Sequence, residues 1–194
     1  MTSRETILQK IKQNKPEPSA LPVLPTFDRP EIDLISHFKE ILKFVGGNPV
    51  ELQIGEDINN HIEGIYPDMK KIASNFEGIR SANVDLSLIS DPHQLEDIDL
   101  VVIKGEFGVA ENAAVWIPAT IISHRALPFI TQHMVFVIEK STLVWNMHQA
   151  YQKLSMDNID GYGVFISGPS KTADIEQSLV IGAHGSRSLT VFLV

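Results

Sequence analysis

The chain has 194 residues, of which 43% are hydrophobic and 21% charged, and its formal net charge is −8. A chain of this length is expected to form one domain with a substantial core. The acidic balance, without clustered lysine and arginine, argues against a nucleic-acid-binding protein. No apolar run approaches the roughly 20 residues that span a membrane, and the first residues lack the apolar core of a signal peptide. We therefore expect a cytoplasmic protein.

The absence of cysteine limits the chemistry that the chain can carry. It excludes disulfide bonds, and it excludes an iron–sulfur cluster held by the chain's own thiolates. The histidines His124, His133 and His148 lack the i, i+4 pairing or the cysteine partners of a zinc site. We expect no cofactor and no metal ion, and we expect these histidines to have ordinary surface or core roles.

The first thirty residues predict a short helix and an extended arm. Residues 1–14 place Ile7, Leu8 and Ile11 on a narrow apolar stripe, with Ser3 as a plausible N-cap. An isolated helix of this length is marginal in water, so it must dock on its own domain or on a partner. Five prolines between positions 16 and 30 then rule out a regular helix. The arm is either a linker without function or a segment that wraps a second subunit.

Residues 31–194 predict a single α/β domain. Helices are predicted at 31–45, 57–65 and 144–155, and strands at 50–54, 71–74, 84–90, 99–104, 113–117, 120–123 and 134–139. The run 100–103 is continuously apolar, as in a strand whose sheet is covered on both faces. We expect a mainly parallel sheet flanked by helices, with some antiparallel strands in the middle.

The last thirty residues predict a strand, a helix and a second strand. The strands are expected at 164–166 and 189–194, and the helix between them is expected to end at Gly182, with Ile175, Leu179 and Val180 on its apolar face. Gly168-Pro169 predicts the turn after the first strand, and Ser170 or Thr172 is a suitable cap for the helix. Such a unit is usually parallel and binds ligands at the carboxyl ends of its strands. The loop 167–172 lies at one such end.

The loop from Ser167 to Thr172 is the first candidate ligand site. Gly168 allows a backbone or a ligand to approach closely, and free N–H groups at the start of the following helix suit an anion. Lys171 and the hydroxyls of Ser170 and Thr172 add possible contacts, although the spacing is not that of a Walker loop. The alternative is a capped turn whose hydroxyls satisfy backbone groups.

The segment from His184 to Arg187 is the second candidate. Arg187 can bind a carboxylate or phosphate through two hydrogen bonds, and His184 can titrate near neutral pH. In the predicted strand–helix–strand unit this segment lies at the opposite end of the sheet from the loop 167–172, so the two need not share a pocket. The alternative is that both side chains satisfy carbonyls at a helix C-terminus or pair with acidic residues.

Glu111 is the third candidate, because it lies between two predicted strands. A carboxylate at the end of a strand can act as a nucleophile or as a general base. The alternative is a loop carboxylate that caps a backbone group or is solvated.

Three stretches resemble motifs of the lactate utilization protein C family, whose members carry a LUD domain. Residues 166–189 resemble its C-terminal signature, and residues 105–115 and 125–138 resemble two further motifs in the expected order. The resemblance implies a fold similar to the ribose-phosphate isomerase, glucosamine-phosphate deaminase and CoA-transferase group. CoA transferases of that fold use a glutamate nucleophile, and Glu111 matches it only by analogy.

The chain departs from this family at two places. Members often read Ala-Glu/Asp-Thr-Gly-Thr where residues 110–114 read Ala-Glu-Asn-Ala-Ala, so a glycine and two hydroxyls are lost at Asn112, Ala113 and Ala114. Ser186 stands where the family usually has proline. These changes predict altered or weaker ligand binding if the family uses those groups.

The resemblance implies an accessory, non-redox subunit of a system that oxidises L-lactate to pyruvate beside iron–sulfur partner proteins. One alternative is an enzyme of the isomerase or CoA-transferase type that binds a phosphate, carboxylate or CoA ligand at 167–172 and uses Glu111. Another is a diverged relative that has no ligand. We expect residues 1–30 to form the arm and residues 31–194 one LUD-like domain.

Overall fold

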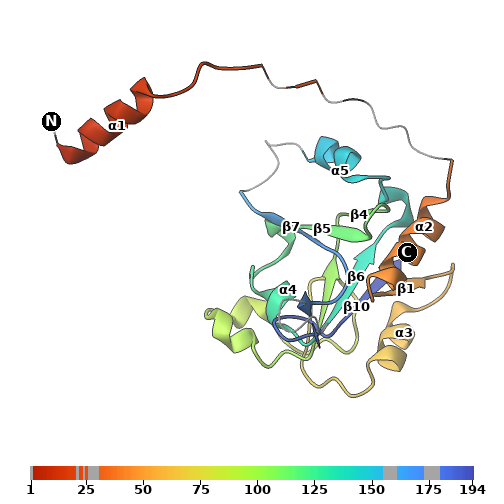
Figure 1. Cartoon of the computed structure of the whole chain (residues 1–194). Helices are drawn as coiled ribbons and strands as arrows, with labels where there is room; N and C mark the ends of the chain where they lie inside the picture. Colours follow the sequence, from red (N-terminus) through yellow and green to blue (C-terminus); the bar gives the residue numbers. More distant parts are fainter. Residues whose placement is uncertain (1, 21, 24, 26–30, 155–160, 173–179) are drawn as a thin grey trace.

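The centre of the molecule is a five-stranded parallel sheet with the strand order β1–β10–β6–β3–β2. The computed structural model describes residues 2–20, 22–23, 25, 31–154, 161–172 and 180–194 (Figure 1). The strands of this sheet are β1 (Asn48–Glu51), β2 (Ile72–Ser74), β3 (Leu100–Lys104), β6 (His133–Ile138) and β10 (Ser188–Leu193). The α/β fold class expected from the sequence is confirmed.

Both faces of this sheet are covered, as the apolar run in β3 predicts. Val101 and Ile103 face one cluster of buried side chains, whereas Leu100 and Val102 face another. All four are fully buried. Because side chains alternate along a strand, only a strand buried on both sides needs an unbroken apolar run.

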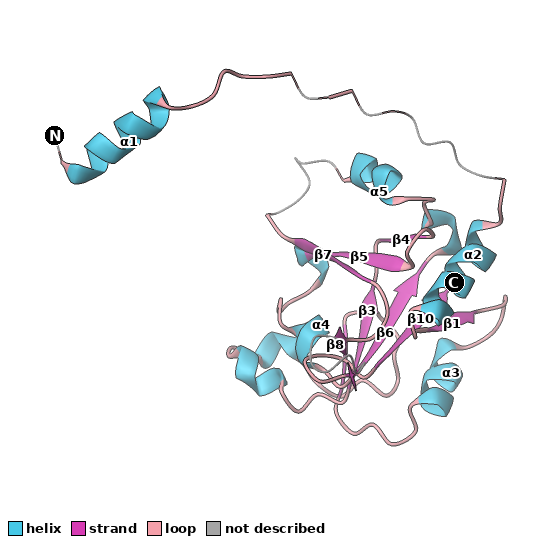
Figure 2. Cartoon of the chain, viewed as in Figure 1, coloured by secondary structure: helices cyan, strands magenta, loops and turns pink. Residues whose placement is uncertain are grey.

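Helices α2 (Leu34–Phe44) and α3 (Ile58–Ile65) cover opposite faces of the sheet (Figure 2). Phe38 of α2 belongs to the first cluster, and Ile62 of α3 belongs to the second. Each helix begins at an aspartate. Asp33 accepts the backbone N–H groups of residues 35 and 36, and Asp57 accepts that of residue 59. These caps satisfy donors that the helix itself cannot pair.

A second, antiparallel sheet lies against the first cluster. It consists of β4 (Phe107–Val109), β5 (Ala114–Pro118) and β7 (Gly163–Ile166), and α5 (Met147–Lys153) packs beside it. Trp116 of β5 contacts the ring of Phe165 in β7, with ring centroids 4.6 Å apart. A Cβ atom at Gly163 would lie 2.1 Å from the Trp116 ring, so only glycine fits beside this indole.

Helix α1 (Ser3–Gln13) stands apart from the body of the molecule (Figure 1). Its N-cap is Thr2, which forms a capping box with Glu5, so the prediction of Ser3 as the cap is wrong by one residue. No residue of α1 is buried. None of the helices in the described part of the chain has both the length and the apolar character needed to cross a bilayer.

Two predicted strands are short 3₁₀ helices instead. Residues 84–90 contain η1 (Leu86–Leu88), where the Asp85 side chain accepts the N–H of Ser87. Residues 120–123 overlap η3 (Ala119–Ile121), which follows directly after Pro118 ends β5. In the first case the local turn chemistry of aspartate outweighs the strand preference of the neighbouring apolar residues.

The predicted strand–helix–strand unit at the end of the chain is wrong. Strand β7 pairs with β5 in the antiparallel sheet, whereas β10 lies in the parallel one. Lys171–Thr172 (β8) and Val180–Ile181 (β9) form a separate antiparallel pair. Of the helix predicted to run from its cap at Ser170 or Thr172 to Gly182, residues 171–172 and 180–181 belong to these strands, and residues 173–179 lie outside the described ones.

Candidate functional site

The two candidate loops near the end of the chain line one pocket of about 260 Å³. Its polar side chains are Ser167, Ser170, His184 and Ser186. Its apolar side chains are Pro128, Phe129, Met134, Val164, Phe165, Ile166 and Pro169. The inference that the two loops lie at opposite ends of a sheet is therefore wrong, because β7 and β10 do not share a sheet.

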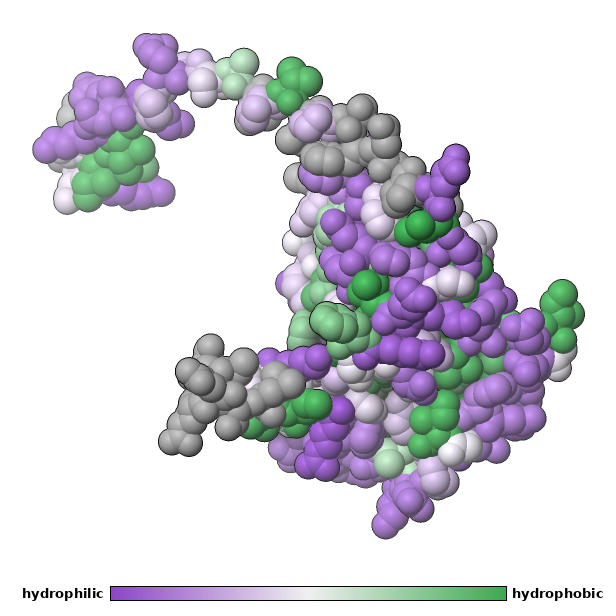
Figure 3. Space-filling model, turned by 45° about the vertical axis from the view of Figure 1, so that its right-hand side comes forward, coloured by the Kyte–Doolittle hydropathy of each residue, from purple (hydrophilic) through white to green (hydrophobic). Residues whose placement is uncertain are grey.

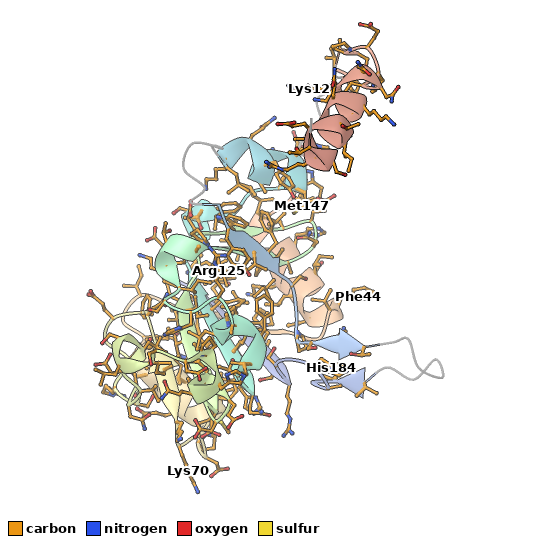
Figure 4. All side chains as sticks on the ribbon, turned by 90° about the vertical axis from the view of Figure 1, so that its left-hand side faces the viewer. Lys12, Phe44, Lys70, Arg125, Met147 and His184 are labelled. Atoms are coloured by element: carbon orange, nitrogen blue, oxygen red, sulfur yellow. The ribbon has the colours of Figure 1, made fainter. Side chains whose placement is uncertain are left out.

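Backbone hydrogen bonds hold the two loops together. The N–H of Ser170 donates to the carbonyl of Ser186 at 2.9 Å, and the N–H of Gly182 donates to the carbonyl of Ser170 at 2.9 Å. A Cβ atom at Gly185 would lie 3.0 Å from the Ser170 side chain, so the loops are in close contact. Figure 4 shows His184 beside β8 and β9, the pair of blue strands that projects from the domain.

Gly168 and Ser167 anchor the first loop to the rest of the domain. Gly168 has a φ of 72°, and a Cβ atom there would lie 2.8 Å from the carbonyl oxygen of Val45. Ser167 Oγ donates a hydrogen bond to the carbonyl of Asn112 at 2.6 Å. The loop is thus fixed between the end of α2 and the turn that carries Glu111.

Three predicted ligand residues do not line this pocket. Lys171 and Thr172 lie in β8, so the residues that follow Ser170 form a strand, and the prediction that Ser170 caps a helix is wrong. The backbone N–H of Ser170 bonds to the other loop, as described above, and is not free for an anion. Arg187 donates its backbone N–H to the carbonyl of Gln132 at 2.8 Å, beside the start of β6.

The Glu111 carboxylate caps helix α5. Its Oε2 accepts the backbone N–H of Met147 at 2.9 Å, while Asn146 accepts the N–H of Gln149 at 2.9 Å. Glu111 is not among the residues that line the pocket. This contact matches the alternative role of a capping carboxylate, and a catalytic role for Glu111 stays a prediction.

Ser186 is the pocket residue that sequence reasoning did not select as a ligand. It is 2% exposed, and its Oγ has no hydrogen-bond partner among the described residues. An unpaired buried hydroxyl costs about 1–3 kcal/mol, so this group, like Thr131 Oγ1, needs a partner that the described residues do not supply. The signal in the sequence was a serine at a position where the family it resembles usually has proline.

A polar network lies next to the pocket at the amino ends of β6 and β10. His133 Nδ1 is 2.8 Å from Ser188 Oγ, and the Tyr66 hydroxyl is 3.1 Å from Ser188 Oγ and 2.9 Å from Thr190 Oγ1. Burial lowers the pKa of His133, the positive charge of Arg187 lowers it further, and Asp99 opposes both effects. The imidazole is therefore held in its neutral form in this network at neutral pH.

Comparisons with known proteins agree with these sequence motifs. The family model described as the LUD domain matches residues 90–194. A "Lactate utilization protein C" of Bacillus pumilus is 32% identical over 127 residues, which cover 63% of this chain and 53% of that protein. The "Uncharacterized protein YkgG" of Escherichia coli is 32% identical over 140 residues, 70% of this chain and 54% of that protein. The matched part spans about half the length of these curated relatives.

A solved structure shares the fold. The crystal structure of a DUF162 family protein from Deinococcus radiodurans matches with a TM-score of 0.64, covering 83% of this chain and 96% of that one. The two sequences are 14% identical in this match. The structural match therefore supports the architecture described above and carries no information on the ligand.

Proposed function

This chain belongs to the LUD-domain family, and we propose that it acts in lactate utilization as an accessory subunit without redox centres of its own. The observation that carries this proposal is the match to several curated relatives named lactate utilization protein C. We propose the cytoplasm as its location and residues 31–194 as its single functional domain, with residues 1–30 as an arm.

The chemistry of lactate oxidation supports a non-redox role. Oxidation of lactate to pyruvate releases two electrons and two protons, so an electron acceptor is required. This chain has no cysteine with which to ligate an iron–sulfur cluster, and its described residues contain no group of three or more histidine, aspartate or glutamate side chains that could hold a metal ion. We propose that iron–sulfur partner proteins take the electrons, while this subunit contributes binding or assembly.

The pocket between the two loops is the proposed ligand site. It combines apolar walls with hydroxyl groups and an imidazole that can donate hydrogen bonds, which suits a small anion with an apolar part. Ser167, Gly168, Ser170 and His184 are the predicted ligand residues that lie in this wall. Lys171, Thr172 and Arg187 remain predicted as contacts that a larger anion would reach.

Co-purification from the source organism tests the proposed function. A tagged copy of the full chain, purified from cells grown on lactate, is expected to bring down iron-containing proteins, and cells grown on another carbon source provide the control. Deletion of the gene is expected to abolish growth on lactate, and a wild-type copy should restore it. Recovery of the chain alone, together with unchanged growth of the deletion strain on lactate, would show that the proposal is wrong.

The second candidate is an enzyme of the isomerase or CoA-transferase type that uses Glu111. The observation that favours it is the hydrogen bond from Ser167 to Asn112, which places the turn carrying Glu111 directly against the pocket loop. A Glu111→Gln variant separates catalysis from capping, because its amide oxygen can still accept the N–H of Met147. A catalytic role predicts that the variant keeps its fold but loses its isomerase or CoA-transferase activity. A capping role alone predicts that the variant keeps both.

A further inference from the structure

Helix α1 presents an apolar face that nothing covers in the described part of the chain. Its three large apolar side chains are 56% (Ile7), 48% (Leu8) and 54% (Ile11) exposed. They gather on one side of the helix, as Figure 3 shows. The capping box between Thr2 and Glu5 gives this short helix a defined start. A helix of this length that exposes its apolar stripe gains stability by docking on another surface.

The charges of α1 oppose those of the rest of the chain. Residues 1–15 hold four basic side chains and one acidic one, so this segment carries +3 and the remaining residues carry −11 of the net −8. Arg4 and Lys12 lie four residues on either side of Leu8, next to the apolar stripe. Glu5, the acidic residue of the segment, is engaged in the capping box. The helix therefore fits an acidic surface that has an apolar hollow.

Such a hollow lies at the carboxyl end of β1 in the central sheet. This groove, of about 350 Å³, has mainly apolar walls formed by Leu52, Ile54, Ile58, Phe76 and Val194, and it also includes Glu56, Asp57 and Lys140. Ile54 is fully exposed at its edge. Asp57 pairs with Arg80, and Lys140 lies 3.7 Å from the carboxylate of Glu51. Glu56 accepts the N–H of Gln53 and lies 3.6 Å from His61, so its carboxylate has no lysine or arginine partner among the described residues.

We propose that α1 of one copy of this chain docks in the groove beside Ile54 on a second copy. Residues 14–33 connect α1 to α2, and a polyproline II segment of this number of residues would reach about 60 Å. Within this segment, residues 14–20, 22–23 and 25 are exposed and form no helix or strand, and α1 stands clear of its own domain in Figure 1, so the helix is available to another molecule. Two copies that exchange their helices form two such contacts at once, which strengthens a contact that is weak alone. This inference does not rest on the proposed function.

Sedimentation of the full chain at low and high salt tests the exchange. We expect a dimer at low salt, whose dissociation constant rises about tenfold at high salt because the attraction of opposite charges is screened. Replacing Ile7, Leu8 and Ile11 together by serine should weaken the dimer about 100-fold or more, and Ile54→Ser should weaken it by about tenfold. Leu88→Ser is the matched control, because Leu88 is 79% exposed and lies outside the groove.

Disulfide trapping identifies the partner. Because the natural chain has no cysteine, only the introduced cysteines can form a disulfide. A Leu8→Cys chain and an Ile54→Cys chain with tags of different length are mixed and oxidised. The proposal predicts a mixed disulfide dimer in excess over both homodimers, and its loss when Ile7 and Ile11 are serine. A monomer at every concentration, a dimer that is insensitive to the α1 changes, or an internal disulfide in the double variant without cross-linked dimer would each overturn it.

Discussion

Ala113 is strained by its backbone conformation, and this strain can be measured. It is the one non-glycine residue in the described part of the chain with a positive φ, 55°, and it is fully buried in the turn between β4 and β5. The left-handed region costs a residue with a Cβ atom about 1–2 kcal/mol. An Ala113→Gly change removes that cost. It also loses about 0.8 kcal/mol of methyl burial and about 0.4–1 kcal/mol through the freer unfolded chain. The expected net change in unfolding free energy lies within about 1 kcal/mol of zero.

Ala110→Gly provides the matched control. Ala110 lies three residues earlier, is fully buried in the same cluster, and does not have a positive φ. It therefore loses both contributions without relief of strain, and its unfolding free energy should fall by about 1.2–1.8 kcal/mol. At about 2–4 °C per kcal/mol for a chain of this size, Ala110→Gly should melt about 2–7 °C below the wild type. Ala113→Gly should stay within about 4 °C of it.

Urea denaturation and thermal melting of the three proteins give the comparison directly. The informative quantity is the difference between the two variants, because methyl burial and chain entropy are nearly the same in both. A difference of about 1–2 kcal/mol in favour of Ala113→Gly is the expected result. Equal destabilisation by the two changes would refute the strain at Ala113.

Three further outcomes follow from the same structure. Gly168→Ala should cost about 2 kcal/mol or more in a melting experiment, because its Cβ would meet the carbonyl of Val45 at positive φ, whereas Gly64→Ala on the open surface of α3 should stabilise by about 0.5–1 kcal/mol. Burial lowers the pKa of His133, so the unfolded chain binds a proton there more readily than the folded one. The unfolding free energy should therefore fall as the pH drops below about 6.5, and His133→Asn should reduce that fall. Ser186→Ala should stabilise the free protein by about 1 kcal/mol while weakening ligand-dependent protection against heat, since it removes an unpaired buried hydroxyl from the pocket.

The elements that the sequence predicts well are those whose pattern is set by burial alone. The apolar repeat of residues 31–45 matches α2, and the unbroken apolar runs match β3 and β6 to within one residue at each end. For these segments one face or both faces contact the core, so the periodicity of the side chains follows directly from the geometry of the element.

For the end of the chain, the sequence did not reveal which strands pair with each other. The sequence predicts strands at 164–166 and 189–194, and a connection of this length usually gives a parallel pair. Their actual partners lie far away in the sequence. Strand β7 pairs with β5, where the Phe165 ring contacts that of Trp116, and β10 pairs with β6, where Ser188 lies opposite His133. Once β7 joins the antiparallel sheet, the two candidate loops meet, which no local pattern in either loop indicates.

The turn at 110–114 connects features that looked independent in the sequence. Its carbonyl at Asn112 accepts the Ser167 hydroxyl of the pocket loop, and its Glu111 carboxylate caps α5. The strained Ala113 follows directly after these two residues, and the Asn112 side chain accepts the N–H of Ala114 at 3.0 Å across it. A change of backbone conformation at this turn would therefore move the pocket loop and the helix cap together. Substitutions here should alter ligand binding even though none of these residues lines the pocket.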